Sequence, residues 1–367
     1  MPFAGEGNAE VRIAIDCREL VGWPTGVGRY LAALLTAWGE MPAAATHEFV
    51  FCAPERVTHS SLENLRVSCQ VAPGSGTLWE QAVLPRLVAS AGADVLFSPA
   101  YTCPLWCRAP IVLVIHDVSF AAHPEWFSWR EGLRRRTLTR LGARRAARVI
   151  TESDFSKREI TRLLGIPSSD IDVIYLGAST WQQPADAERR PIVLYVGSIF
   201  NRRHIPELVD GFRSLAARLP DVRLEIVGDN RTNPHIDMDR LIAASGIAER
   251  VHWRSYISDA DIATLYATAS AFVFLSDYEG FGLTPIEAMA AGVPIVVLDT
   301  EISREIYGPA AEYLPRPDPG LIATSLERVL TANAERGRLI EAGTQQVKRY
   351  SWRECAQRTL QVLLAAR

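Results

Sequence analysis

Two glutamates, Glu279 and Glu287, stand eight residues apart on either side of a glycine-containing turn that reads GFGLTPI. The turn joins an apolar run, residues 271–275, which we expect to be a strand, to a helix that Pro285 opens. A strand, a glycine turn and a helix N-terminus form an anion site, because the free N–H groups of the first turn point outward and the helix dipole adds partial positive charge. Carboxylates accept hydrogen bonds from paired hydroxyls. Two of them beside a phosphate site predict a sugar on one side and a ribose on the other.

The helix after the turn has proline at its first position and Gly292 just past its last, which is the polarity of a real helix. A second apolar run, residues 295–298, follows it. Considered alone, Glu287 also fits a solvent-exposed residue of a helix. Glu279 alone also fits a charged residue of an exposed loop. Both acids, the glycines and the proline in one short window favour the sugar-nucleotide interpretation.

The stretch from Glu279 to Glu287 resembles the E-x7-E motif of family 4 glycosyltransferases, in their mannosyltransferase- and rhamnosyltransferase-like group. The resemblance runs from Val11 to about Leu364 and is strongest at this motif. It implies the α/β GT-B fold, in which two Rossmann-like, doubly wound domains face a cleft and a C-terminal helix returns to the first domain. It also implies a retaining enzyme that transfers a hexose from a nucleotide diphosphate sugar.

Length and composition agree with a two-domain globular protein. The 367 residues allow about two ordinary domains, and the net charge of −3 argues against a dedicated nucleic-acid binder. The six cysteines are dispersed and lack the spacing of a zinc site, which indicates reduced thiols. No apolar run approaches the roughly 18 residues that span a bilayer. The polar start MPFAGEGNAEV is expected to be neither a signal peptide nor part of the fold, so a cytoplasmic protein is predicted.

Short apolar runs alternate with helical segments in both halves of the chain, which is the pattern of a parallel sheet covered on both faces. We expect an acceptor-binding domain over residues 11–177, a polar linker over 178–190, a nucleotide-sugar-binding domain over 191–350 and a closing helix over 351–367. The expected strands are residues 11–15, 48–52, 66–71, 94–97, 111–115, 149–151, 172–175, 192–196, 223–227, 251–253, 271–275 and 295–298. The family resemblance adds residues 302–306 and 312–314 as the closing strand.

Gly26 and Gly28 follow the first strand in the sequence GVGRY. They do not complete a dinucleotide-binding fingerprint, because the loop after the strand is too long and Leu31 occupies the place of the third glycine. A glycine turn remains at the N-terminus of a helix expected over residues 30–38. The resemblance implies a role near the donor phosphate, since related enzymes carry a similar GxGRY loop. A tight turn without a ligand is the alternative.

His116 and Asp117 come directly after the apolar run 111–115. Ligands of open parallel sheets bind beyond the carboxyl ends of the strands, which is where His116 is expected. A single histidine there is usually structural. The pattern HDxxF followed by PEWF is similar, however, to the sugar-site segment of mannosyltransferase-like members. This resemblance implies that His116 contacts the transferred sugar, while Asp117 orients the loop.

Arg202 and Arg203 stand just before a helix whose apolar residues begin at Ile205. Two cations at a helix start oppose the helix dipole, so an anion such as a nucleotide diphosphate is expected to compensate them. The resemblance implies that Arg203 binds the donor phosphates with support from Arg202. Ser198, which we include among the donor-binding residues, stands where many members have arginine. Without an arginine at position 198, binding of the donor phosphates would depend on Arg202 and Arg203.

Tyr256 and Ile257 match residues that lie against the nucleobase in relatives. Ser258 begins the next helix as an N-cap, with Asp261 three residues on. Three D-x-D triplets resemble a metal-binding pattern of another glycosyltransferase fold, but helix capping and loop polarity explain each better. We assign no metal and no cofactor, with the nucleotide diphosphate sugar as co-substrate. The triplets are Asp170–Asp172, Asp237–Asp239 and Asp259–Asp261.

Residues 130–148 are dense in arginine and are expected to form a basic amphipathic helix, with Leu133, Leu138 and Leu141 on the side opposite the cations. A solvated face is the commoner explanation. The alternative is attraction to anionic lipid or to a lipid-diphosphate acceptor, which would place the protein peripherally at the inner face of the membrane. The arginines are Arg130, Arg134, Arg135, Arg136, Arg140, Arg144, Arg145 and Arg148.

These residues predict how the leaving group is stabilised. Arg202, Arg203 and the N–H groups of the turn would neutralise the departing diphosphate without a metal. Glu279 would hold the sugar hydroxyls and Glu287 the ribose, and the expected catalytic set is His116, Arg203 and Glu279. The sequence offers no convincing carboxylate nucleophile, so same-face attack with a phosphate oxygen as base fits better. The turn residues of the expected donor site are Gly280, Phe281, Gly282, Leu283 and Thr284.

The donor stays open among GDP-, dTDP- and UDP-sugars. HDxxF and PEWF favour a mannose- or deoxyhexose-like sugar and hence GDP or dTDP. A surface polysaccharide or a lipid-linked saccharide is the expected acceptor. Two other classes would share the phosphate site: a GT-B epimerase or phosphorylase, and a non-catalytic nucleotide-sugar-binding subunit.

Overall fold

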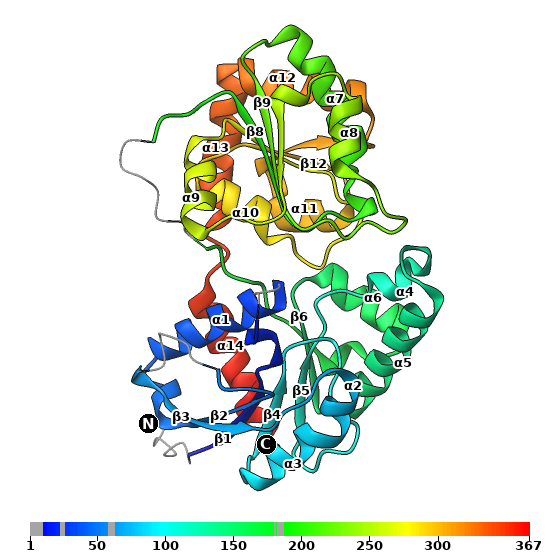
Figure 1. The fold of residues 1–367 in the computed structure, drawn as a ribbon. Helices are drawn as coiled ribbons and strands as arrows, with labels where there is room; N and C mark the ends of the chain where they lie inside the picture. The colour runs from blue at the N-terminus through cyan, green and yellow to red at the C-terminus, as the bar shows by residue number, and fades with distance from the viewer. Residues whose placement is uncertain (1–9, 23–25, 58–62, 180, 182–186) are drawn as a thin grey trace. The chain divides into compact units, whose positions relative to one another are not determined.

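The computed structural model describes residues 10–22, 26–57, 63–179, 181 and 187–367 (Figure 1). The chain divides into two compact units. Unit 1 comprises Met1–Pro124, Ser128–Gly177 and Ser351–Arg367, and unit 2 comprises Glu125–Phe127 and Ala178–Tyr350. The predicted linker lies partly outside the described residues, as does the polar start before Glu10.

Unit 1 contains a seven-stranded sheet in the order β3-β2-β1-β4-β5-β6-β7, with parallel pairing throughout its described strands. The central strands are continuous apolar runs and are buried, as a parallel sheet covered by helices on both faces requires. The strands are β1 (Arg12–Asp16), β2 (Glu48–Ala53), β3 (Arg66–Val71), β4 (Val95–Ser98), β5 (Ile111–Val114), β6 (Arg148–Thr151) and β7 (Ile171–Val173).

The C-terminal helix belongs to unit 1 although it is last in the chain. It packs beside the first helix, where the indole Nε1 of Trp38 donates to the carbonyl of Ala356 at 2.9 Å (Figure 1). The helices of unit 1 are α1 (Gly26–Gly39), α2 (Gly76–Leu78), a π-helical turn (Trp79–Val83), α3 (Leu84–Ser90), α4 (Ser119–Ala122), α5 (Trp129–Arg145), α6 (Asp154–Leu164) and α14 (Trp352–Ala365).

Unit 2 contains a six-stranded parallel sheet in the order β10-β9-β8-β11-β12-β13 among its described residues. The strands are β8 (Ile192–Val196), β9 (Arg223–Val227), β10 (Val251–Arg254), β11 (Ala271–Phe274), β12 (Ile295–Leu298) and β13 (Ala311–Leu314). The helices are α7 (Ile205–Arg218), α8 (Met238–Ala244), α9 (Asp259–Thr268), α10 (Leu283–Ala290), α11 (Glu301–Tyr307), α12 (Pro319–Thr331) and α13 (Asn333–Val347).

The order of each sheet reverses direction at one point, between β1 and β4 in unit 1 and between β8 and β11 in unit 2. This is the strand order of doubly wound dinucleotide-binding sheets, and ligands of such sheets bind at the carboxyl ends of the strands beside the reversal. The prediction of two Rossmann-like sheets is therefore confirmed.

The predicted strand over residues 302–306 is wrong, because this segment forms α11. Thr300 caps the helix by accepting the Ser303 N–H at 3.2 Å. Ile302 and Ile306 then fall four residues apart on the buried face. Burial of that face outweighs the strand preference of two β-branched residues.

The predicted starts of two helices are also wrong. α1 begins at Gly26 and not near Tyr30, so Gly26 and Gly28 lie inside its first turn and not in a turn before it. Packing of the apolar face behind them stabilises the helix despite the low helix propensity of glycine. α10 begins at Leu283, which makes Pro285 its third residue. Proline is tolerated there because the first four N–H groups of a helix have no intrahelical acceptor.

The arginine-dense segment divides between α5, which ends at Arg145, and β6, which begins at Arg148. The expected separation of its leucines from its cations is wrong. Leu133 and Leu141 are exposed, because the face of α5 that packs on unit 1 consists of small residues, chiefly Gly132 and Thr139.

Candidate active site

Two loops meet at the reversal point of the sheet in unit 2, one after β8 and one after β11. The first passes very close to the end of β9. Gly228 has φ +156°, and a Cβ there would lie 1.9 Å from the carbonyl oxygen of Gly197. Only glycine allows this approach. The loop after β8 is thereby fixed against its neighbouring strand before it reaches the arginine pair.

Arg203 and Glu279 form a buried ion pair between these two loops. The guanidinium donates to Glu279 Oε1 from Nε at 2.9 Å and from Nη2 at 2.8 Å. The side chains are 11% and 15% exposed. The hydroxyl of Ser276 donates to the same oxygen at 2.6 Å, and Arg203 Nη1 donates to the carbonyl of Ser198 at 2.6 Å. The structure thus brings together Arg203, Glu279 and Ser198.

The guanidinium of Arg203 keeps donor capacity for a ligand. Burial alone lowers the pKa of Arg203, but the Glu279 carboxylate outweighs that effect and the pKa is raised above its ordinary value. An arginine side chain carries five N–H groups. Three are committed to the hydrogen bonds with Glu279 and Ser198, and the Tyr195 hydroxyl also contacts the guanidinium, which leaves at least one for an anion.

Arg202 is placed differently from its neighbour. Its guanidinium lies over the ring of Phe200, 4.5 Å from the centroid. Its Nε is buried and makes no hydrogen bond with the part of the chain that the structure describes. A buried donor without an acceptor is costly. Arg202 is therefore the member of the pair whose Nε lacks an acceptor among the described residues.

His204 links the loop after β8 to the loop after β11. It adopts a left-handed conformation, φ +51°, between the short helix Asn201–Arg203 and α7. Its Nε2 is 2.7 Å from Asp277 Oδ2, and its Nδ1 is 3.6 Å from a Glu207 oxygen. Burial alone lowers the pKa of His204, but the hydrogen bonds to these carboxylates outweigh it and raise the pKa to about 9. The imidazole is accordingly charged at neutral pH.

α10 begins at Leu283, four residues after Glu279. Gly282 caps it with φ +86°, and a Cβ there would lie 2.1 Å from the hydroxyl of Tyr307. That hydroxyl donates to the Gly282 carbonyl at 3.3 Å. The amides of Leu283 and Thr284 occupy the first turn, where no intrahelical acceptor exists. Of the other turn residues, Phe281 is buried with its ring edge-on to Tyr350, and Gly280 precedes it.

Glu287 lies on the buried side of α10. It is fully buried, and its Oε2 accepts from the hydroxyl of Tyr266 at 3.1 Å. Tyr256 is exposed and Ile257 is buried, at the end of β10. No contact tests the predicted roles of these three residues, which stay predictions.

In unit 1, His116 is held at both ring nitrogens. Nδ1 bonds the carboxylate of Glu152, and Nε2 lies 2.7 Å from the carbonyl oxygen of Pro99. An ionised carboxylate and a carbonyl oxygen only accept, so this arrangement favours the doubly protonated, positively charged form of the ring. Burial alone lowers the pKa of His116, but Glu152 outweighs it and the pKa is raised above its ordinary value.

Two tyrosine rings pack against the His116 ring in T-shaped contacts. The centroids of Tyr30 and Tyr101 lie 5.2 Å and 5.3 Å from that of His116. Tyr101 has φ +56°, and its hydroxyl donates to Asp117 Oδ2 at 3.0 Å. Asp117 Oδ1 accepts the Ser119 N–H at 2.7 Å, which agrees with its expected role of orienting the loop.

Glu152 is a site residue that the sequence reasoning missed. β5 and β6 are neighbours in the sheet, and His116 and Glu152 follow them within two residues. Carboxyl ends of adjacent parallel strands meet at one sheet edge. Pairing the two polar residues that end the runs 111–115 and 149–151 would have found this contact.

Two family models together match residues 24–346 of the chain. The model described as Glycosyltransferase Family 4 matches residues 24–182, and the model described as Glycosyl transferases group 1 matches residues 179–346. The chain belongs to glycosyltransferase family 4. It is therefore a glycosyltransferase, and its two doubly wound units are the GT-B fold.

Similar proteins include mannosyltransferases of bacterial glycans. The O-antigen chain mannosyltransferase B of Escherichia coli is 28% identical over 262 residues, which are 68% of this chain and 68% of the relative. The MMP alpha-(1->4)-mannosyltransferase of Mycolicibacterium hassiacum is 29% identical over 271 residues, 69% of this chain and 64% of the relative. The match thus spans about two thirds of each relative's length.

Among solved structures, HepE of Anabaena in complex with UDP and glucose superposes with a TM-score of 0.75. The match covers 97% of this glycosyltransferase and 100% of that chain, at 19% sequence identity. This likeness supports the fold.

Helix capping is confirmed for one D-x-D aspartate, Asp237, and for the predicted N-cap Ser258 beside the triplet Asp259–Asp261. Asp237 accepts the Arg240 N–H at 3.0 Å at the start of α8, and the N-cap Ser258 accepts the Asp261 N–H at 3.2 Å at the start of α9. The described residues contain no group of three or more His, Cys, Asp or Glu that could hold a metal ion.

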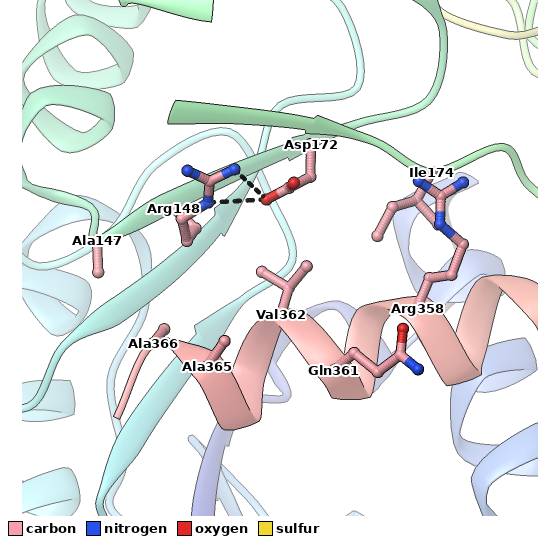
Figure 2. Close-up of a pocket in the computed structure, with 9 residues that line it drawn as sticks. All are labelled: Ala147, Arg148, Asp172, Ile174, Arg358, Gln361, Val362, Ala365 and Ala366. Carbon is pink, nitrogen blue, oxygen red and sulfur yellow. Dashed lines mark hydrogen bonds and ion pairs between the residues drawn. The ribbon is translucent and has the colours of Figure 1, made fainter. Parts of the chain in front are cut away.

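A groove of about 620 Å³ in unit 1 contains none of the predicted site residues. It lies between α14 and the strands β6 and β7, and Figure 2 shows Arg148 and Asp172 pointing toward each other on its strand side. Its lining residues are Ala147, Arg148, Asp172, Ile174, Arg358, Gln361, Val362, Ala365 and Ala366.

Proposed function

We propose that this glycosyltransferase moves a mannose- or deoxyhexose-like hexose from a nucleotide diphosphate sugar to a saccharide or lipid-linked saccharide acceptor. Anomeric configuration would be retained, no metal ion would take part, and the reaction would serve surface polysaccharide synthesis. The names of the relatives, one an O-antigen mannosyltransferase, support the sugar and the setting. Unit 2 would hold the donor and unit 1 the acceptor.

The observation that carries the donor site is the arginine pair at the reversal point of the unit 2 sheet. Among the described residues the buried Nε of Arg202 has no acceptor, and Arg203 keeps at least one uncommitted N–H group. The N-terminus of α10 begins a few residues after Glu279, the partner of Arg203. Two guanidinium groups and a helix N-terminus suit a diphosphate, because both supply N–H donors and positive charge.

Glu279 would hold the transferred sugar. Its Oε1 accepts from Arg203 and Ser276, so a sugar hydroxyl would bind at Oε2. Since the ion pair already balances the carboxylate, Glu279 would not repel the neighbouring diphosphate. Glu287 would bind the ribose after its bond with Tyr266 is exchanged, and Tyr256 would face the nucleobase.

The chemistry would be leaving-group departure with same-face attack. The bond between the anomeric carbon and the phosphate oxygen breaks, and the acceptor oxygen forms the new bond from the same face. The acceptor proton passes to the departing phosphate oxygen. Arg202, Arg203 and the α10 amides act where negative charge develops, which is the most effective place for a preorganised donor.

His116 would contact the transferred sugar. Both of its ring nitrogens already have partners, Glu152 and the carbonyl of Pro99. A sugar hydroxyl would therefore take the place of the Pro99 carbonyl at Nε2. Glu152 would keep the ring charged and oriented during this exchange.

A thermal-shift panel with UDP, GDP, dTDP, ADP and their common sugar conjugates tests the donor site, with and without EDTA. A ligand at about 100 times its Kd stabilises the folded state by about 2.7 kcal/mol. That corresponds to a rise in Tm of about 2–4 °C per kcal/mol in a unit of this size. We expect one base to raise Tm equally in both conditions.

One further measurement tests the stereochemistry of the reaction. Product stereochemistry is read from the anomeric proton coupling by NMR, and an inverted product would reject retention. A folded protein whose Tm no nucleotide shifts would reject the donor site, and a shift abolished by EDTA would reject metal independence. Arg213→Gln, a surface change on α7 away from the loops, serves as the control variant.

A further inference from the structure

One face of α5 exposes large apolar side chains among its arginines. Trp129 is 71% exposed, and Leu133 and Leu141 are also exposed. At about 100° per residue, these three and the exposed arginines fall within an arc of about 160° around the helix axis. Its buried face carries Gly132 and Thr139. The exposed face is therefore mixed, with apolar and cationic groups side by side.

Four of the exposed arginines on this face form no ion pair with the described residues. Glu131 is the one acid in the α5 sequence, and it pairs with Arg134 and Arg135 at 2.9 Å and 2.6 Å. Within the described residues no ion pair involves the other four exposed arginines. These are Arg130, Arg136, Arg140 and Arg144.

Two further exposed apolar residues lie on segments that touch α5. Leu78, 78% exposed, follows Thr77, whose hydroxyl accepts from Arg134 Nη1 at 3.2 Å. α2, which carries both residues, lies beside α5 (Figure 1). Trp106, 85% exposed, precedes Cys107, whose carbonyl accepts from Arg145.

We call this region of unit 1 the Arg–Trp surface. It holds five of the seven large hydrophobic residues that are exposed in the described chain, so the exposed apolar area is concentrated and not scattered. It consists of Leu78, Trp106, Trp129, Leu133, Leu141, Arg130, Arg136, Arg140 and Arg144.

We propose that the Arg–Trp surface docks this glycosyltransferase on membranes that contain anionic lipids. Tryptophan prefers the boundary between headgroups and acyl chains, and arginine extends its charge to the headgroups while its stem lies along apolar surface. The unpaired cations complement anionic headgroups. A second copy of the chain fits less well, because a symmetric contact would bring the same cations together.

The electrostatic attraction to anionic headgroups comes from this surface and not from the chain as a whole, whose net charge is −3. No helix among the described residues is long and apolar enough to cross a membrane. The inference goes beyond the proposed function, and it stands or falls independently of the donor chemistry.

Vesicle flotation of the full chain tests the proposal, with phosphatidylcholine vesicles against vesicles that contain 30% phosphatidylglycerol. We expect binding to the anionic vesicles alone, weakened by salt. Each arginine near an anionic surface contributes about a fivefold gain in partitioning. The triple variant Arg136→Gln, Arg140→Gln and Arg144→Gln should therefore lose roughly 100-fold in partitioning.

A matched variant removes the same charge elsewhere, with Arg213→Gln, Arg240→Gln and Arg353→Gln on exposed faces of α7, α8 and α14. It should bind like the wild type. Trp129→Ser with Leu133→Ser should weaken binding while keeping its salt dependence. These two changes test the apolar contribution, and unaltered Tm values ensure that all variants are folded.

Three results would overturn the proposal. They are equal binding to neutral and anionic vesicles, equal loss in the two triple variants, and no binding to either vesicle. Light scattering provides the fourth check. A dimer that the Arg136, Arg140 and Arg144 changes dissociate would assign the surface to a second copy instead.

Discussion

Arg203 donates two hydrogen bonds to a single oxygen of Glu279, from Nε at 2.9 Å and from Nη2 at 2.8 Å. Ser276 donates to that oxygen as well. The other carboxylate oxygen takes part in no hydrogen bond with the described residues. Glu279 can therefore neutralise a buried cation with one oxygen and offer the other to a ligand.

Glu279→Gln separates these two tasks. A hydrogen bond to a charged group contributes about 1.5–3 kcal/mol, which is about 10- to 150-fold in affinity. We expect kcat/KM for the sugar donor to fall by that factor, while the sugar-free nucleotide diphosphate binds at least as tightly as before. Isothermal titration with both ligands measures the difference, and the exposed Glu341→Gln is the control. A near wild-type kcat/KM with normal donor binding would contradict the sugar-holding role.

The two arginines should respond differently to the same substitution. Arg203→Gln leaves Glu279 nearly buried without its cation, and breaking such a pair costs about 3 kcal/mol or more. Arg202→Gln removes a buried donor that has no acceptor and should leave Tm unchanged or slightly raised. Both variants should weaken nucleotide diphosphate binding by at least tenfold. If Arg202→Gln binds like the wild type, Arg202 does not contact the phosphates.

His204 makes the contact between the loops after β8 and β11 depend on pH. Folding raises its pKa from about 6.5 to about 9, so the stability that it contributes is complete below pH 6.5 and is lost as pH rises through 9. His204→Asn tolerates the left-handed backbone but shortens the reach to Asp277 and Glu207. The unfolding free energies of wild type and variant should therefore converge between pH 7 and pH 10.

Denaturant titrations at four or five pH values measure that convergence. His235→Gln, an exposed histidine in the same unit, should show no such trend. A difference between wild type and His204→Asn that stays constant up to pH 10 would show that the ion pairs of His204 do not stabilise the loops.

Glu152→Gln should lower the pKa of His116. The carboxylate of Glu152 is what raises this pKa against the effect of burial. The wild-type ring stays charged up to a pH above its ordinary pKa and loses that charge as pH rises further. We expect the alkaline limb of the kcat/KM profile to move to lower pH in the variant, together with the His116 resonance in an NMR titration. If His116 titrates identically in the wild type and in Glu152→Gln, Glu152 does not control the charge state of His116.

The sequence predicts most strands because the sheets are buried on both faces. Runs such as residues 192–196 and 295–298 contain almost only apolar, mostly β-branched residues, and their predicted bounds match β8 and β12. The run 302–306 contains Ser303, Arg304 and Glu305 between its isoleucines, which gives a four-residue spacing and a helix. The strand was expected from the resemblance to the family and not from the periodicity of this segment.

The candidate site was predictable where its residues form a motif and not where they only meet in space. Glu279, Gly282 and Glu287 lie in one window of the sequence. The pairing of His116 with Glu152 depends on which strands are neighbours. The same holds for Arg203 with Glu279, whose separate roles were predicted but whose contact was not. Spatial order in a sheet is not local sequence information.

Gly282 and Tyr307 should show strong coupling in a double-mutant cycle. Gly282→Ala places a Cβ 2.1 Å from the Tyr307 hydroxyl and forces an L-residue into φ +86°. The left-handed conformation alone costs about 1–2 kcal/mol, and the overlap adds to it. Tyr307→Phe removes the hydroxyl and, with it, one hydrogen bond of about 1 kcal/mol to the Gly282 carbonyl.

In the double variant the overlap is gone, so the loss of unfolding free energy should be smaller than the sum of the two single losses. The coupling energy should be about 1 kcal/mol or more, as for residues in direct contact. If the losses of unfolding free energy in the two single variants add, Gly282→Ala is destabilising through the backbone conformation alone and not through overlap with Tyr307. Donor affinity measured on the same variants then tests the cap itself, because a displaced α10 N-terminus would present its first amides away from the phosphates.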